Sequence, residues 1–147
     1  MKTTAFAGAL AVLALMTSGA ASAQSSAPYG APISLESAKA VGAAVHAEAV
    51  KRKVPGTFAV VDILGEMVVV DRGMDASNGA VDIALAKARS AIKYKKANLA
   101  LEGFPAGLDG MGAGGALLMS GGKIVGAIGV SGGAEGALAQ AGAAASK

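Results

Sequence analysis

The sequence contains one histidine, His46, and no cysteine, so few of its side chains could act as a nucleophile or bind a transition metal. Imidazole is a common general base and a common metal ligand. A catalytic Ser/His/Asp set would need this same histidine. His46 falls at the edge of the apolar stripe of a predicted helix, where a ligand could face a groove. The alternative is a surface histidine without a chemical role.

Five cations follow one another near the end of a second predicted helix, with no acidic residue among them. They could neutralise the carboxylates of an acidic ligand. They would equally suit the negative end of the helix dipole as a solvated group, because their angular spread does not form one face. These cations are Lys87, Arg89, Lys93, Lys95 and Lys96.

Other metal and phosphate sites find little support in the residue spacing. The aspartates do not have the spacing of a calcium loop, and no set of His, Asp and Glu offers three transition-metal ligands. Gly112 to Gly115 precede a predicted strand, so they do not form the glycine-rich loop that leads into a helix and binds nucleotide phosphates.

Small side chains dominate the composition, with 22 glycines and 36 alanines among 147 residues. A chain with 53% hydrophobic and 16% charged residues is too apolar to be disordered, and its length allows one domain. The formal net charge of +3 is mild and predicts no nucleic-acid partner. Because so many alanines make a thin core, we expect a homo-oligomer that buries further apolar surface.

Residues 1–23 have the three parts of a secretory signal peptide. Lys2 provides the positive start, residues 5–16 form an uncharged apolar run, and Ala21-Ser22-Ala23 provides the small residues before a cleavage site. The alternative is a membrane anchor, but a spanning helix needs about 20 apolar residues. We therefore expect cleavage after Ala23, a periplasmic or secreted product and no stable membrane span.

The remaining chain reads as a flexible leader and one domain. The Ser/Pro/Gly-rich residues 24–33 predict a leader without fixed structure, and residues 34–147 predict a single α+β domain. Apolar spacing and turn residues predict helices over 34–53, 81–97 and 133–145, one β-hairpin over 57–71 and a second that pairs 116–119 with 124–130. Residues 101–115 read as a loop. The order α-β-β-α-β-β-α predicts an antiparallel sheet built from two hairpins and covered by helices.

Two segments resemble the signatures of a known family. The two motifs of the GlcG/HbpS haem-binding family are similar to residues 59–91, AVVDILGEMVVVDRGMDASNGAVDIALAKARSA, and to residues 114–142, GGALLMSGGKIVGAIGVSGGAEGALAQAG. The chain also resembles the C-terminal domain of PduO-type proteins. The sequence departs from the pattern where Gly73 extends the usual Arg-Met-Asp. A second departure is the segment after Gly133, which lacks the usual aspartate.

The resemblance implies a profilin-like or roadblock-like fold, homo-oligomers and the binding of haem or a related tetrapyrrole. It implies an exported protein that acts in haem capture, storage or redox sensing, with His46 as the iron ligand and Lys87, Arg89 and Lys93 beside the propionates. The alternative is a non-haem small-molecule binding or accessory protein of a catabolic pathway with the same fold. Some relatives degrade haem, but beyond His46 and Asp62 no acid/base set is visible, and we expect no enzyme.

Overall fold

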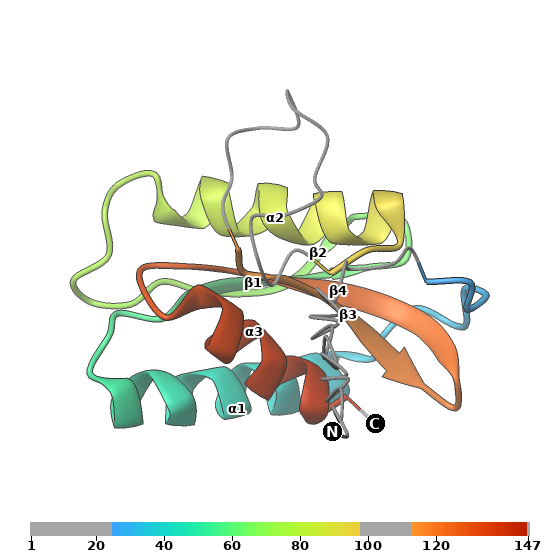
Figure 1. Ribbon diagram of the computed structural model, residues 1–147, viewed down its shortest axis with the longest axis horizontal. Helices are drawn as coiled ribbons and strands as arrows, with labels where there is room; N and C mark the ends of the chain where they lie inside the picture. Colours follow the sequence, from blue (N-terminus) through green and yellow to red (C-terminus); the bar gives the residue numbers. More distant parts are fainter. Residues whose placement is uncertain (1–24, 98–112, 147) are drawn as a thin grey trace, which may run out of the picture.

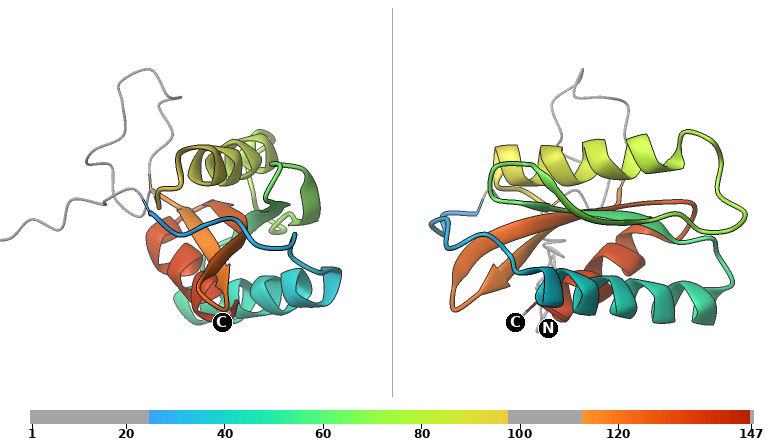
Figure 2. Two further views of the ribbon diagram at one scale, coloured as in Figure 1. Left: turned by 90° about the vertical axis from the view of Figure 1, so that its right-hand side faces the viewer. Right: turned by 180° about the vertical axis from the view of Figure 1, so that it is seen from behind.

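Four antiparallel strands form one sheet with helices on both faces. The computed structural model describes residues 25–97 and 113–146. The elements are α1 (Leu35–Arg52), β1 (Thr57–Asp62), β2 (Met67–Asp71), α2 (Ala80–Tyr94), β3 (Gly115–Ser120), β4 (Lys123–Ser131) and α3 (Glu135–Ala144). The strand order is β2-β1-β4-β3. Helices α1 and α3 cover one face and α2 covers the other (Figures 1 and 2), so the predicted α+β class and element order are confirmed.

Helix α1 begins and ends through local capping. The Ser34 side chain accepts a hydrogen bond from the Ser37 N–H, which satisfies one of the free donors of the first turn. The helix ends where Lys53 adopts a left-handed conformation (φ 56°) and its N–H bonds back to the carbonyls of Ala49 and Val50. The buried stripe of α1, which includes Val41 and Val45, packs onto the sheet beside α3.

Asp62 and Gly65 build the turn between β1 and β2, within the hairpin predicted over residues 57–71. The Asp62 Oδ1 accepts hydrogen bonds from the N–H groups of Leu64 and Glu66, at 2.8 and 3.0 Å. Gly65 has φ 82°, a backbone conformation that residues other than glycine rarely adopt. The carboxylate therefore organises a turn and is not directed at a ligand.

The glycines of β4 allow α2 to approach the sheet closely. A Cβ at Gly129 would overlap the Ala84 carbonyl oxygen and the Ala88 backbone of α2. The core on this side combines three alanines with Val61, Ile92 and Ile124, whereas the larger core lies under α1 and α3. The thin core predicted from composition is thus offset by close approach of backbones.

The leader lies against the sheet where the structure describes it, although its composition predicted a flexible segment. Tyr29 forms a parallel bridge with Ile124 of β4, and the N–H of Ile33 donates to the carbonyl of Val125. These residues continue along β4 where its pairing with β1 ends, at Gly126. Ile33 is buried in the core, which a tally of turn-forming residues does not predict.

The predicted signal peptide, residues 1–23, and most of the predicted loop 101–115 lie outside the described residues. Among residues 25–97 and 113–146, no helix is both long and apolar enough to cross a membrane.

Candidate functional site

His46 is exposed on α1 and lines two adjoining hollows. The larger hollow, of about 530 Å³, lies between the end of α1, the 53–56 turn and residues 71–75. The smaller one, of about 370 Å³, lies between α1 and β2. Asp71 also lines both hollows. We call the combined hollow the His46 groove.

The smaller part of the His46 groove is mainly apolar. Helix α1 contributes Gly42 and Ala43, and the sheet contributes Phe58, Val69 and Val70. An added Cβ at Gly42 would collide with the Phe58 ring, so the glycine makes room for an aromatic side chain beneath the helix. An apolar planar molecule would meet an apolar surface here.

The larger part of the groove gathers charged and polar side chains near His46. Lys53 and Arg72 contribute positive charge, Asp71 and Asp75 contribute negative charge, and Met74 contributes a thioether. In addition, Lys39 borders the apolar part of the groove. The groove therefore offers one imidazole, one thioether, three cations and two carboxylates to a ligand.

Two backbone contacts hold the segment after β2 against the groove. The Gly73 N–H donates to Thr57 Oγ1 at 3.1 Å, and Arg72 Nη2 donates to the Ala76 carbonyl at 2.6 Å. A Cβ at Gly73 would overlap the Pro55 carbonyl. The glycine that departs from the family pattern thus lets this segment lie close to the 53–56 turn.

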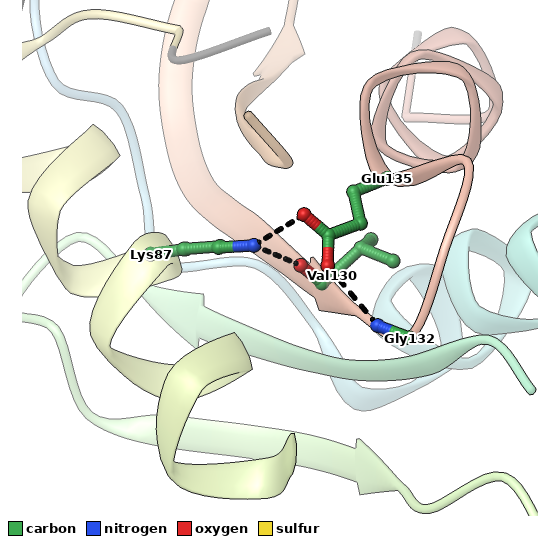
Figure 3. A network of polar contacts seen from close by, with 4 residues as sticks. All are labelled: Lys87, Val130, Gly132 and Glu135. Carbon is green, nitrogen blue, oxygen red and sulfur yellow. Dashed lines mark hydrogen bonds and ion pairs between the residues drawn. The ribbon is translucent and has the colours of Figure 1, made fainter. Parts of the chain in front are cut away.

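Lys87, one of the predicted ligand-binding residues, is an internal structural residue. Its Nζ donates to Glu135 Oε2 at 2.6 Å and to the Val130 carbonyl at 3.0 Å, while Glu135 Oε1 accepts from the Gly132 N–H (Figure 3). The Lys87 side chain is only 3% exposed. It connects α2, β4 and α3, so it has no free surface for a propionate, and our expectation for Lys87 is not met.

Arg89 and Lys93 line a different pocket, of about 380 Å³, together with Tyr29, Leu64 and Glu66. We call it the α2 pocket. Arg89 Nε also donates to the Gly65 carbonyl at 3.0 Å. Because α2 covers the opposite face of the sheet from α1 (Figure 2), a single chain does not bring these cations together with His46.

Ionic contacts near His46 on α1 are local. The hydrogen bond from the Arg52 guanidinium, helped by the nearby Lys51, lowers the pKa of the Glu48 carboxyl below its ordinary value. Within the two described segments, no three His, Asp or Glu side chains come close enough to hold a metal ion. Iron bound by His46 would therefore have to arrive within a ligand that supplies its other donors.

The sequence Gly129-Val130-Ser131-Gly132-Gly133 matches the Gly-x-Ser-x-Gly pattern of serine hydrolases, and it leads from a strand into a helix. Ser131 is nevertheless a buried strand residue opposite Thr57, and it lacks the positive φ of a sharp nucleophile turn. The pattern therefore builds the end of β4 and presents no nucleophile.

Sequence reasoning found His46 but missed the cations that share its groove. Arg72 carried a signal, since it stands in the motif segment after β2. Lys39 and Lys53 carried one as well, because they stand seven residues before and after His46, a spacing that returns to the same side of a helix.

Comparison with known proteins supports the fold and identifies the family of this chain. Residues 33–146 match the family model for haem-degrading protein HbpS-like. No curated protein matches the sequence.

Three solved structures are similar along most of their length, each with 28% sequence identity. Protein ORFY of Klebsiella pneumoniae has a TM-score of 0.68 over 84% of this chain and 97% of its own. The complex of PduOC with heme has a TM-score of 0.66 over 78% and 94%. A double variant of HbpS from Streptomyces reticuli has a TM-score of 0.66 over 96% and 97%. The chain therefore belongs to the HbpS-like family of haem-degrading proteins.

Proposed function

We propose that this protein is an exported haem-binding protein and that the His46 groove is its haem site. The observation that carries the proposal is the position of the one histidine of the sequence, which is exposed in a groove that is apolar on one side and lined by charged side chains, cations among them, on the other. Support comes from the family, and from a relative of the same fold whose structure is a complex with heme.

The residues of the groove fit the chemistry of haem. The volumes of its two parts, about 530 and 370 Å³, fall in the range of ordinary ligand pockets. His46 would ligate the iron, and the apolar wall with Phe58 and Val69 would contact the porphyrin face. When bound, haem would supply redox or oxygen chemistry at its iron.

The propionates of haem are expected beside Lys39, Lys53 and Arg72. These three cations border the groove that contains His46. Lys87 is engaged with Glu135, and Arg89 and Lys93 line the α2 pocket on the other face. We therefore move the expected propionate contacts from α2 to the groove.

Haem capture, storage or redox sensing outside the cytoplasm is the role we propose, because the first 23 residues read as a signal peptide. The second candidate is a non-haem small-molecule binder of the same fold. It is favoured by one observation, that Gly73 changes the usual Arg-Met-Asp segment at the groove itself.

Haemin titration of the purified protein tests the proposal. We expect a saturable shift of the Soret band in the parent and a weaker, displaced band in His46→Ala. Addition of free imidazole should restore the parent spectrum in His46→Ala, since it replaces the missing ligand without repairing any packing. A matched control is Lys96→Ala, which alters a residue outside the groove. A parent protein without a Soret shift would favour the non-haem candidate.

A further inference from the structure

Tyr29 gives the α2 pocket an aromatic wall that is held in place. Its hydroxyl donates to the Ile92 carbonyl at 2.8 Å, and its backbone forms the bridge with Ile124 of β4. The Lys95 ammonium lies over the ring, 4.2 Å from its centroid, and donates to the Ala27 carbonyl at 3.1 Å. Tyr29 is nevertheless 42% exposed and lines the pocket, so the residue offers surface to a ligand.

The turn between β1 and β2 adds apolar surface to the same pocket. Ile63 and Leu64 line it, beside Ile92 of α2. Leu64 is 78% exposed, a position that burial in the core does not explain. A ligand with an apolar body would remove part of this surface from water, which is favourable in proportion to the area covered.

Arg89 and Lys93 add two positive charges from one face of α2, since they stand four residues apart in the helix. The Arg89 Nε donates to the Gly65 carbonyl at 3.0 Å, which fixes the guanidinium beside the pocket. Among the described residues, neither Arg89 nor Lys93 forms a salt bridge. Both can therefore bind a carboxylate, the group that arginine recognises through paired hydrogen bonds.

The helix dipole explains only one of these two cations. Lys93 lies in the last turn of α2, where positive charge complements the negative end of the helix. Arg89 lies five residues before Tyr94, the last residue of the helix, and so falls outside that turn. Glu66 is the acidic side chain that lines the pocket, so two cations stand against one carboxylate. A ligand with a single negative charge would balance this lining.

We propose that the α2 pocket binds a small monocarboxylate with a planar apolar body, for which benzoate is the probe. The carboxylate pairs with Arg89 and Lys93, and the planar body lies against Tyr29 and Leu64. The pocket volume of about 380 Å³ suits a small molecule. The pocket lies on the opposite face of the sheet from the His46 groove (Figure 2), so this is a second site. The inference does not rest on haem binding, and its test uses protein without haem.

Calorimetric titration with benzoate tests the charge recognition. We expect saturable binding by the parent and at least about tenfold weaker binding of benzamide, which has nearly the same shape without the charge. Arg89→Gln and Lys93→Gln should each raise the Kd for benzoate severalfold. Glu66→Gln removes a repelling charge and should lower it. Lys51→Gln, the same charge change on the exposed side of α1, should leave the Kd unchanged.

Amide chemical shifts and one apolar variant test where the body of the ligand lies. We expect the largest shifts on benzoate addition at residues 63–66 and 89–93, which border the pocket. Leu64→Ser should raise the Kd severalfold and leave the Tm unchanged, because the side chain is mostly exposed without a ligand. Circular dichroism and thermal melting establish that each variant is folded.

Four results would overturn the inference. The first is no binding by the parent up to about 10 mM benzoate, and the second is equal affinity for benzamide. The third is parent-like affinity in folded Lys93→Gln and Leu64→Ser. The fourth is a set of shifts centred on the His46 groove, which would move the anion to the other face. If Arg89→Gln unfolds because it loses its bond to the Gly65 carbonyl, Lys93→Gln and Leu64→Ser decide.

Discussion

Replacing Lys87 with methionine removes one partner of an internal ion pair and keeps most of the side-chain volume. The variant loses the Nζ contacts to Glu135 Oε2 at 2.6 Å and to the Val130 carbonyl at 3.0 Å. Removing one partner of a buried pair typically destabilises a protein by about 3–5 kcal/mol. Glu135 is 27% exposed and keeps its bond from the Gly132 N–H, so we expect a loss at the lower end, about 3 kcal/mol.

Urea and thermal unfolding measure this loss. In a domain of this size, about 3 kcal/mol corresponds to a fall in Tm of roughly 10 °C. The matched control is Lys93→Met on the same helix, where the lysine is exposed and the expected change is within about 0.5 kcal/mol. Glu135→Gln should also lose stability, because the amide has one acceptor oxygen for the two donors Lys87 Nζ and Gly132 N–H, and because Lys87 keeps its charge without a carboxylate partner. A Lys87→Met protein as stable as Lys93→Met would refute the reasoning that this pair holds α2, β4 and α3 together.

Three further outcomes are expected. Asp62→Ala should lower stability by about 1 kcal/mol, because two turn N–H groups lose their acceptor; an unchanged Tm with loss of haem binding would instead make Asp62 a binding residue. Gly129→Ala should destabilise by about 3 kcal/mol or more, since its Cβ would overlap α2 at Ala84, and a parent-like Tm would contradict this packing. The mature chain should begin at Gln24 when it is analysed by mass spectrometry, and a chain that retains residues 1–23 would contradict the cleavage prediction.

The helices and hairpins could be predicted because their signals are local. Ser34 caps α1 through a residue three positions away, and Asp62 and Gly65 build their turn within five residues. Such contacts depend on neighbouring residue types, which the sequence displays directly. The antiparallel sheet then follows because each hairpin pairs strands that are adjacent in sequence.

The environment of the cations could not be predicted, because it depends on partners distant in sequence. Lys87 and Glu135 are 48 positions apart and meet only when α2 and α3 pack against the same end of β4. The cluster near the end of α2 therefore looked like one group of charges, while the fold gives Lys87 an internal bond, places Arg89 and Lys93 in the α2 pocket and directs Lys95 to the Ala27 carbonyl. The contacts of the leader could not be predicted for the same reason, since Ile33 is buried beside β4, which lies far along the chain.

The sequence allowed the position of His46 to be predicted, but not all the residues that share its groove. Helical spacing put His46 at the edge of an apolar stripe, and the structure places it in a groove as that position suggested. The neighbours Lys53, Arg72 and Met74 come from the chain on either side of the β1–β2 hairpin. Lys53 caps the same helix as His46, whereas Arg72 and Met74 reach the histidine only because the hairpin packs beside α1.

The haem affinity of His46→Ala, measured beside that of the double variant Arg89→Ala/Lys93→Ala, tests the location of the site most directly. If haem binds in the His46 groove, His46→Ala should raise the Kd by about tenfold or more, which is about 1.4 kcal/mol. The double variant, which alters only the α2 pocket, should bind haem as the parent does. Parent-like affinity in His46→Ala together with lost affinity in the double variant would contradict the account and place the ligand on the opposite face of the sheet.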